Sequence, residues 1–567
     1  MPRVAYAASP QADPILPDNA AIVCDTIVMH GIGGLFWGRR MPRPFTVVLS
    51  LPGDCPLSPA RAALAPLLAR HPRDRILLLV PRMYARTRWL ARTLGLACVA
   101  ACEVDPHDLA RTVREVWAMA PATYQHDLCI LIALHGHQIT FLDSDGWPEQ
   151  TFDRSAALNQ LMRQTRYVCP FTGRPISCLE LLNLLLLWKQ VMGANRQIGA
   201  CMGMSLWKRP QISAFLATPE GSPAFFHSIR RAIAACQKKS RDNVAIWATR
   251  MPPQAEEYIH KAGRHLLRVE DGFVRSLGLG SALNPPSSIF LDSRGIYYDP
   301  ATESDLEHIL ATYDFDADIR ARAEKLIARL HASGISKYDR GEKPTASATG
   351  TIPARRRDNR PIILVPGQVA DDLSVLRGGG QIRDNLSLLR AVRMAHPDAH
   401  IIYRPHPDVD GGYRKGAIPD AVVLTLADEI NRKGAITTLL ARVDAVHTLT
   451  SLAGFEALIR AIPVTTYGTP FYAGWGLTED RGRIPTRRNR QLLLTELVAG
   501  ALLLYPRYLD PVTRLPCPIE VLLDRFEEPT FWKPTVWTHL RKIQIRFFQM
   551  ARQGRTVTDH FFHRVHN

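Results

Sequence analysis

Short β-rich runs alternate with helical patterns along much of this chain, and that alternation limits the possible folds more than any other feature of the sequence. Before residue 340 the expected strands are residues 244–248 and 265–269, with a helix through 256–260 between them. After residue 360 the expected strands are residues 362–365, 400–403, 445–449 and 464–467, again with helical patterns between them. Strands that alternate with helices of this length predict an α/β fold whose parallel sheets are covered by helices on both faces.

A polar segment divides these elements into two groups. Residues 341–361 contain Pro and Gly and have no apolar periodicity, which is typical of a linker. The division predicts an N-terminal Rossmann-like domain over residues 180–340, a linker over 341–360 and a C-terminal Rossmann-like domain over 361–530. We expect two such domains, joined by a linker, to face one cleft.

An internal repeat marks a further boundary. Residues 166–182 read RYVCPFTGRPISCLELL and residues 507–523 read RYLDPVTRLPCPIEVLL, with seven identical positions. Chance similarity of two Pro-rich segments is the alternative explanation. We favour the interpretation that each copy ends a module, so that residues 1–165 are a shortened remnant of a preceding module or an accessory domain.

The composition narrows the class of protein and its partners. Of the 567 residues, 46% are apolar and 22% charged, which excludes a disordered or collagen-like chain. The formal net charge of +17 favours polyanions, acidic small molecules or an anionic membrane surface as partners. Nucleic acid is not expected, because the basic residues are spread through the sequence rather than clustered with stacking aromatics. The sequence has no run of roughly 18 apolar residues and no apolar signal segment at its start, so we expect a cytoplasmic protein.

The last segment, residues 531–567, is basic and aromatic. Its apolar residues Leu540, Ile543, Phe547 and Met550 fall on one helical stripe with basic residues beside them. This pattern is compatible with a helix that lies on an anionic membrane surface. Packing of the same helix against the N-terminal Rossmann-like domain explains the pattern equally well.

Two carboxylates and two arginines lie at the end of the strand at 265–269 and directly after it. In the segment RVEDGFVR, Glu270 and Asp271 lie between Arg268 and Arg275. Ligands of open α/β sheets collect beyond the carboxyl ends of the strands, which places this group where acid/base chemistry is possible. A surface turn is the alternative, because Asp-Gly is a common turn pair.

A second group, in the segment VPGQVADDLS, follows the strand at 362–365. It contains Gln368 and the paired carboxylates Asp371 and Asp372, and three glycines follow at residues 378–380. Glycine lets backbone amides approach an anion, and a carboxylate at the end of a strand can act as a nucleophile or a base. Helix capping by the paired aspartates is the alternative.

Two further groups have the character of an anion site. His406 lies between two prolines after Arg404, at the end of the strand at 400–403, where it could donate a hydrogen bond to a phosphate. Thr450 or Ser451 begins a helix whose free amides attract anions, and Glu456 in that helix could reach a ribose. A structural histidine and simple helix capping are the alternatives.

Six motifs occur in one order along residues 190–530. They are EDGFVRSLGLG, PPSSIFLDSRGIYYD, SKYDRG, VPGQVADDLSV, YRPHPDV and HTLTSLAGFEALIRAIPVTTYGTPFYAGWGLTED. Together they resemble the capsule polysaccharide biosynthesis proteins of the KpsC and LipA type. The resemblance implies a GT-B-like fold, in which two Rossmann-like domains face a cleft. It also implies a retaining glycosyltransferase that adds β-Kdo, an acidic keto sugar, from CMP-Kdo to a lipid-linked oligo-Kdo chain.

By motif position, the resemblance implies roles for individual residues. Asp372 would be the nucleophile and Glu270 the acid/base group, with Asp271 and Asp371 as the nearest rivals. The donor and its phosphate are expected at His406, Arg404, Ser451, Thr450, Glu456 and Gln368. The sugar carboxylates are expected at Arg268, Arg275 and Lys337. No metal or other cofactor is expected, because a CMP-sugar carries one phosphate that cationic and dipolar groups can balance.

The resemblance also implies a location and partners. The protein would lie on the inner face of the cytoplasmic membrane, with a phosphatidylglycerol-based acceptor and other capsule assembly proteins as candidate partners. Proteins of the KpsC type carry two modules in tandem, whereas residues 1–165 contain no second EDGF or TSLAGFEA motif. Two other functions stay open: a GT-B transferase that uses another nucleotide sugar, and a noncatalytic capsule assembly or export factor.

Overall fold

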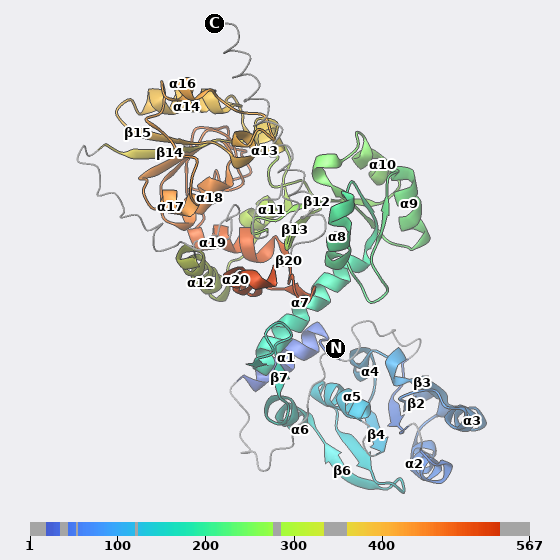
Figure 1. Ribbon diagram of the computed structural model, residues 1–567. Coiled ribbons are helices and arrows are strands. Elements are labelled where there is room, and N and C mark those ends of the chain that lie inside the picture. The colour runs from blue at the N-terminus through green and yellow to red at the C-terminus, as the bar shows by residue number, and fades with distance from the viewer. Residues whose placement is uncertain are drawn as a thin grey trace. The chain divides into compact units, whose positions relative to one another are not determined.

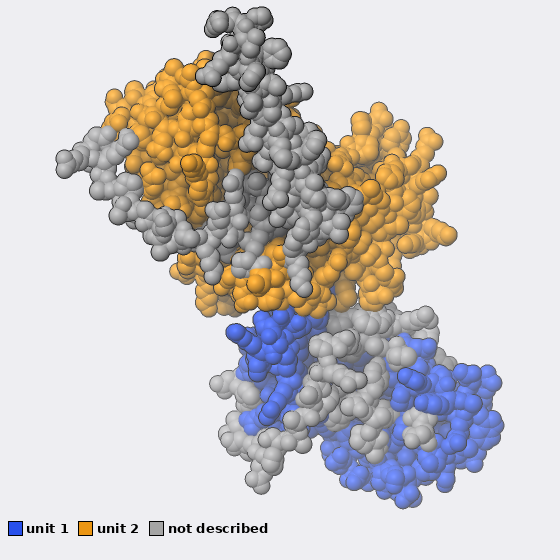
Figure 2. Space-filling view, in the orientation of Figure 1, with its two compact units in different colours: residues 1–191 blue, residues 192–567 orange. Residues whose placement is uncertain are grey.

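The computed structural model describes residues 19–33, 44–52, 55–119, 123–275, 285–333 and 360–532. It contains two compact units, residues 1–191 and 192–567, which are drawn in different colours in Figure 2. The boundary falls within helix α7 (Cys178–Arg196), whereas the sequence placed it between residues 165 and 180. Most of the predicted linker, residues 341–359, and the predicted tail from residue 533 lie outside the described residues. None of the described helices is both long and apolar enough to cross a lipid bilayer.

Unit 1 is built on a six-stranded sheet with helices on both faces (Figure 1). The strand order is β3-β2-β1-β4-β5-β6, and all neighbours are parallel except β5 and β6. Its strands are β1 (Val47–Ser50), β2 (Ile76–Val80), β3 (Ala97–Ala100), β4 (Glu115–Met119), β5 (Ile139–Leu142) and β6 (Pro148–Phe152). Its helices include α1 (Ala20–His30), α2 (Leu57–Arg70), α3 (Ala85–Leu94), α4 (Pro106–Ala110), α5 (Thr123–Leu134) and α6 (Arg154–Asn159). The central strands are fully buried because apolar residues fill both faces of a parallel sheet.

Unit 2 contains two α/β lobes, of which the N-terminal one has a seven-stranded sheet in the order β10-β9-β11-β12-β13-β20-β21. Its strands are β9 (Ile198–Met202), β10 (Ala224–Phe226), β11 (Asn243–Trp247), β12 (His265–Asp271), β13 (Ser288–Asp292), β20 (Arg507–Leu509) and β21 (Pro516–Cys517). Its helices include α8 (Arg209–Phe215), α9 (Ile229–Lys238), α10 (Ala255–Lys261), α11 (Asp305–Thr312), α12 (Ala317–Ser333) and α20 (Ile519–Glu527).

The C-terminal lobe has a six-stranded parallel sheet in the order β16-β15-β14-β17-β18-β19. Its strands are β14 (Ile362–Pro366), β15 (His400–Arg404), β16 (Glu429–Ile430), β17 (Ala445–Thr448), β18 (Val464–Thr466) and β19 (Glu479–Asp480). Its helices include α13 (Leu373–Gly378), α14 (Asn385–Ala395), α15 (Pro407–Asp410), α16 (Asp420–Val423), α17 (Ile436–Leu440), α18 (Leu452–Ile459) and α19 (Leu494–Val498). The strands predicted from the alternation are thus confirmed.

The C-terminal lobe does not extend to residue 530 as the sequence suggested. Strand β20 pairs antiparallel with β13, so the chain returns to the N-terminal lobe after residue 506. Helix α20 follows in the same lobe, where Arg322 of α12 donates two hydrogen bonds to Glu520, at 2.7 and 2.8 Å. The sequence does not predict this return, because β13 and β20 are separated by the entire C-terminal lobe and no local pattern marks two strands as partners.

The internal repeat is also a structural repeat. Each copy follows a π-helical turn, Gln160–Gln164 or Ala499–Leu504, and forms a two-residue antiparallel hairpin that leads into a helix. Tyr167 donates to the carbonyl of Leu161 at 2.8 Å, and Tyr508 donates to the carbonyl of Leu502 at 2.8 Å. The sheet before each hairpin has the same strand order. Unit 1 therefore matches the C-terminal lobe and its closing hairpin in strand order, but its last strand β6 runs antiparallel to β5 whereas β19 runs parallel to β18.

A buried ion pair connects the two lobes of unit 2. Glu307 of α11 and Arg488 of the C-terminal lobe are both buried, and an Arg488 Nη2 to Glu307 Oε2 distance of 3.0 Å joins them. Arg488 also donates to the carbonyls of Pro470 and Ala473, at 2.6 and 2.9 Å. Its guanidinium thus binds a carboxylate of one lobe and the backbone of a loop in the other.

Arg488→Leu is expected to lower the free energy of unfolding of unit 2 by about 3–5 kcal/mol, because it leaves Glu307 with less counter-charge in a buried position. The matched control is Arg432→Leu, since Arg432 pairs with Asp410 and Asp420 at the surface. That change should cost less than about 1 kcal/mol. Urea denaturation of the full chain measures both, and an equal loss in the two variants would contradict the prediction.

Candidate functional site

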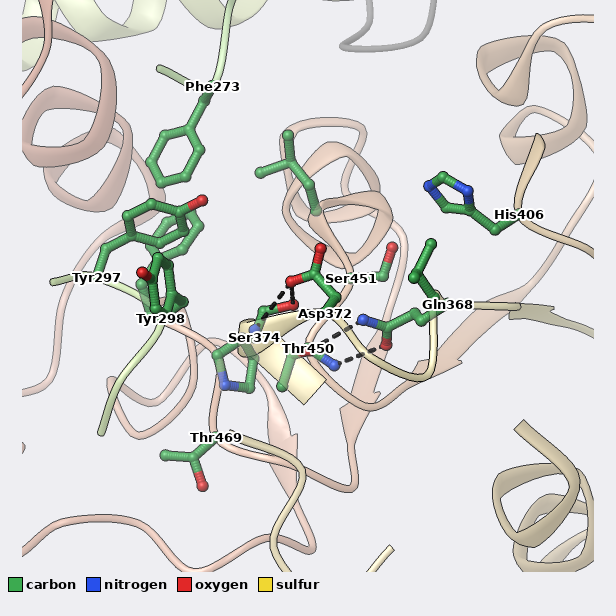
Figure 3. Close-up of a pocket in the computed structure, with 14 residues that line it drawn as sticks. Phe273, Tyr297, Tyr298, Gln368, Asp372, Ser374, His406, Thr450, Ser451 and Thr469 are labelled. Carbon is green, nitrogen blue, oxygen red and sulfur yellow. Dashed lines mark hydrogen bonds between the residues drawn. The ribbon is translucent and has the colours of Figure 1, made fainter. Parts of the chain in front are cut away.

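A cavity lies between the two lobes of unit 2, at the carboxyl ends of strands β14, β15 and β17 (Figure 3). It encloses about 740 Å³ including its open mouth, within the range of small-molecule sites. The side chains that line it are aromatic or polar, and include Phe273, Tyr297, Tyr298, Gln368, Asp372, Ser374, His406, Thr450, Ser451, Thr469 and Phe471. The six segments of the chain that supply them are separated in the sequence, and the sheet edge and the opposite lobe bring them together.

The aromatic wall comes from both lobes. Phe273, which follows β12, stacks on Phe471 of the C-terminal lobe with ring centroids 4.5 Å apart. Tyr297 packs edge-on against Phe273 at 4.9 Å. Burial, together with the charges of Glu270 and Asp372, raises the pKa of Tyr297 well above its ordinary value. Its hydroxyl therefore stays protonated as a possible hydrogen-bond donor, and both carboxylates act on this one group.

Asp372 places a carboxylate in the cavity. It caps helix α13, and its Oδ1 accepts from the backbone N–H and the hydroxyl of Ser374, at 2.9 and 2.8 Å. Within the described residues Oδ2 has no hydrogen-bond partner, and it is free to meet a ligand. Figure 3 shows Asp372 between the aromatic side chains and His406. Asp371, the rival in the sequence, does not line the cavity and pairs with Arg414 at 3.0 Å.

The side chain of Gln368 connects two loops that line the cavity, the loop after β14 and the loop before α18. Its amide nitrogen donates to Thr450 Oγ1 at 2.9 Å, and its amide oxygen accepts from the Thr450 N–H at 3.0 Å (Figure 3). Its own backbone N–H donates to the side chain of Asn385 at 2.8 Å. Because both ends of the amide bind protein atoms, Gln368 positions the start of helix α18 rather than offering its amide to a ligand.

His406 and Ser451 form the polar side of the cavity. Ser451 caps α18, and its hydroxyl accepts from the Ala453 N–H at 3.2 Å. His406 caps α15, and its Nδ1 accepts from the Asp408 N–H at 3.1 Å. The proton of the neutral ring must then be on Nε2, which makes that atom a hydrogen-bond donor. The start of α18 and the ring of His406 therefore lie together on this side of the cavity, and the N-terminus of a helix favours an anion.

A smaller side cavity adjoins this polar side. His406 and Ser451 line both spaces, and Arg404 and Glu456 line the side cavity only. Arg404 donates to the Asn431 side chain at 2.8 Å and to the carbonyl of Gly434 at 2.6 Å. The six donor-site residues predicted from the sequence therefore lie together around two connected spaces, as the common edge of β14, β15 and β17 requires.

Asp271 is placed differently from its neighbour Glu270. Asp271 Oδ2 lies 3.0 Å from Lys208 Nζ and 2.9 Å from Arg275 Nε. Burial alone would raise the pKa of Asp271, but Arg275 and Lys208 together lower it. Lys208 in turn lies 3.5 Å from the ring centroid of Trp247. Asp271 is thus held as a carboxylate by two cations and is unsuited to exchange a proton.

The two arginines expected to bind sugar carboxylates do not line the cavity. Arg275 pairs with Asp271, and Arg268 pairs with Glu256 at 2.7 Å. Both are buried, so carboxylates of the protein itself occupy their guanidinium groups. The assignment of Arg268 and Arg275 to sugar carboxylates stays a prediction, and binding there would require them to leave these ion pairs. Lys337, the third candidate, lies outside the described residues, and its role stays a prediction.

Sequence reasoning missed Lys208 and the two tyrosines of the aromatic wall. Lys208 lies in no motif and reaches Asp271 only through the fold. Tyr297 and Tyr298 lie in the IYYD segment, whose tyrosine pair was the available signal. No group of three or more His, Cys, Asp and Glu side chains suited to a metal ion is present in the described part of the chain.

The fold and the site together define a class of protein. Two α/β lobes enclose a polar cavity at the carboxyl ends of parallel strands, where a capped helix and a histidine favour an anion and a carboxylate lies nearby. Unit 2 is therefore a two-lobed α/β structure with a polar and aromatic cavity between its lobes.

The chain belongs to the family of capsule polysaccharide biosynthesis proteins. The sequence model of that family matches residues 242–508. The lipopolysaccharide-processing protein LpsZ of Rhizobium meliloti is 36% identical over 327 residues, which are 56% of this chain and 72% of LpsZ. The capsule polysaccharide modification protein LipA of Neisseria meningitidis serogroup A is 41% identical over 355 residues, which are 62% of this chain and 48% of LipA. The predicted likeness to LipA is thus confirmed, although the chain spans only about half the length of the LipA relatives.

Two solved chains of KpsC from Thermosulfurimonas dismutans are also similar. The β Kdo 2,7 transferase is 36% identical, with 58% of this chain and 99% of that chain covered and a TM-score of 0.47. The β Kdo 2,4 transferase is 29% identical, with 58% and 98% covered and a TM-score of 0.49.

Asp271→Asn is expected to destabilise unit 2 by about 3–5 kcal/mol, because it leaves Lys208 and Arg275 buried without their counter-charge. The folded-state pKa of Asp271 is lowered, so its stabilisation is complete above about pH 4 and is lost as the pH falls below the unfolded-state value. The variant should therefore also flatten the acid limb of the stability curve. Asp372→Asn is the control, and should change stability by less than about 1 kcal/mol, because Asn caps helices as well as Asp. Urea denaturation at several pH values tests both statements.

Proposed function

We propose that this chain is a retaining glycosyltransferase with GT-B-like lobes, which adds β-Kdo from CMP-Kdo to a lipid-linked oligo-Kdo chain in capsular polysaccharide biosynthesis and export. The observation that carries the proposal is the position of Asp372, whose Oδ2 is open to the cavity that His406 and the start of α18 also line. A carboxylate beside an anion site is the arrangement that transfer of a sugar from a nucleotide by double displacement needs. The family membership and the likeness in sequence to two KpsC Kdo transferases, 36% and 29% identical, make Kdo the sugar to test first.

The donor phosphate is proposed to bind where the two cavities meet. His406 Nε2–H and the free amides at the N-terminus of α18 would hold the single phosphate of CMP. The side cavity would take the nucleoside, with Glu456 near the ribose and Arg404 adding positive charge. These groups balance one phosphate without a metal, and we propose that no cofactor is needed.

The sugar is proposed to lie against the aromatic wall, within reach of Asp372. In the first step a carboxylate oxygen of Asp372 forms a bond to the anomeric carbon, and the bond to phosphate breaks so that CMP leaves with the electron pair. In the second step an acceptor hydroxyl replaces Asp372 at the same carbon and gives its proton to Glu270. Two inversions restore the original configuration. Tyr297 and Tyr298, which stay protonated, could donate hydrogen bonds to the sugar.

The acceptor and the location follow from the same proposal. The N-terminal lobe would bind the oligo-Kdo chain of a phosphatidylglycerol-based lipid, with Lys337 as a candidate for its carboxylates. The net charge of +17 suits an acidic donor, an acidic acceptor and an anionic lipid surface. We therefore propose a cytoplasmic protein at the inner face of the membrane, working with other capsule assembly proteins.

Asp372→Asn is expected to abolish Kdo transfer while the protein still folds and binds CMP, because the amide cannot act as the nucleophile. Asp371→Asn is the matched control, since it removes a neighbouring carboxylate that pairs with Arg414 outside the cavity. Purified protein, CMP-Kdo and a synthetic Kdo-bearing acceptor, with products read by mass and linkage, provide the assay. Normal turnover by Asp372→Asn would refute the nucleophile assignment.

His406→Phe is expected to weaken CMP binding by about tenfold or more, because it removes a hydrogen bond to a charged group worth about 1.5–3 kcal/mol. His265→Phe changes an exposed histidine at the start of β12 and serves as the control. Isothermal titration of each protein with CMP, UDP and GDP measures the affinities. Preference for UDP or GDP would favour a transferase that uses another nucleotide sugar.

A further inference from the structure

A basic and aromatic surface covers the outer side of α2 and α3 in unit 1. We call it the α2–α3 surface and define it by Arg61, Arg82, Tyr84, Arg86, Trp89 and Arg92, all of which are exposed. The basic residues are spread through the sequence, but the fold brings Arg61 of α2 to Trp89 of α3, and Arg82 and Tyr84 immediately precede α3.

Trp89 is the centre of this surface. Its side chain is 49% exposed, and the guanidinium of Arg61 on helix α2 lies 5.6 Å from its ring centroid. Helices α2 and α3 lie near each other at one end of unit 1 (Figure 1). Arg86 and Arg92 lie one helical turn before and after Trp89 on the same face of α3. The opposite face of α3, which includes Leu90 and Ala91, is buried against the sheet. Within unit 1 the helix therefore points its large aromatic ring and its arginines outward.

Acidic residues are missing from these elements. Neither α2 nor residues 75–102 contain an Asp or a Glu. Several positive charges therefore lie on one face without a carboxylate on the same elements to neutralise them. Such a face attracts anions over distances of about the Debye length.

The corresponding part of the C-terminal lobe has a different charge. Strand β15 lies beside β14 as β2 lies beside β1, so the connection from β15 to β16 matches the connection from β2 to β3. That connection contains Asp410 and Asp420, and Arg432 pairs with both, at 2.8 and 2.6 Å. The unneutralised charge is thus a property of the unit 1 copy rather than of the shared topology.

We propose that the α2–α3 surface binds the surface of a bilayer that contains anionic phospholipids. Guanidinium groups bind phosphate oxygens in pairs, and Trp and Tyr favour the headgroup level, where the ring is apolar and the polar tip stays wet. An outward-facing helix surface with a protruding indole fits a flat layer of phosphates. The proposal extends the proposed membrane location but does not depend on the transferase activity, because vesicle binding is measured without donor or acceptor.

The test is flotation of the full chain with two kinds of vesicle, phosphatidylcholine alone and phosphatidylcholine mixed with phosphatidylglycerol. The unchanged protein should float only with the vesicles that contain phosphatidylglycerol, and added salt should release it. The double variant Arg86→Glu with Arg92→Glu should lower the partition coefficient at least about tenfold. Trp89→Ala should lower it by about threefold or more, with little change in its dependence on salt.

The matched control is Arg73→Glu with Arg75→Glu. These exposed arginines precede β2, whereas Arg82 follows it, and the two double variants have the same net charge. The control should keep the partition coefficient within about twofold of the unchanged chain. An equal loss in both double variants would overturn the proposal, because net charge alone would then explain the binding. Unchanged binding by Arg86→Glu with Arg92→Glu would overturn it as well, since the attachment would lie elsewhere. Because all four arginine side chains are exposed, the thermal unfolding curves of both double variants should superimpose on that of the unchanged protein. The double variant Arg86→Gln with Arg92→Gln removes the two charges without reversing them, and provides a second, smaller change at the same positions.

Discussion

The contact between Arg488 and Glu307 is the interaction on which the site depends. It joins the lobes by a buried ion pair, and the same guanidinium binds the carbonyl of Pro470. The next residue, Phe471, stacks on Phe273 of the other lobe and forms part of the cavity wall. Loss of the ion pair would therefore disturb the aromatic wall of the cavity and also lower the stability of unit 2. The reason is that the Arg488 side chain holds both the contact between the lobes and the loop that carries Phe471.

Much of the fold and of the polar side of the site could be predicted from the sequence. The strands follow from the alternation, and Asp372, His406 and Ser451 meet because parallel strands end at one edge of a sheet. The engagement of Arg268 and Arg275 could not be predicted in this way. The ion pairs of these arginines with Glu256 and Asp271 form only in the folded chain. A sequence motif identifies the residue types but does not show which side chains will contact one another.

The two copies of the repeat show how one backbone can be stabilised by different chemistry. In the second copy Asp510 and Arg525 are buried and joined at 2.9 Å. The equivalent positions of the first copy are Cys169 and Leu184, which cannot form an ion pair. Apolar packing can replace a buried ion pair without loss of stability, and the hairpin is kept in both. The repeat therefore preserves shape where it does not preserve charge, which is also the relation between the α2–α3 surface and its counterpart in the C-terminal lobe.

The pairing of β13 with β20 has a consequence for synthesis of the chain. The N-terminal sheet of unit 2 lacks its last strands until residues 507–517 have left the ribosome, after the whole C-terminal lobe has been made. Unit 1, whose sheet ends at Phe152, can complete its strands much earlier. Folding during translation should therefore occur in separate steps, with unit 1 first and the two lobes of unit 2 closing together at the end.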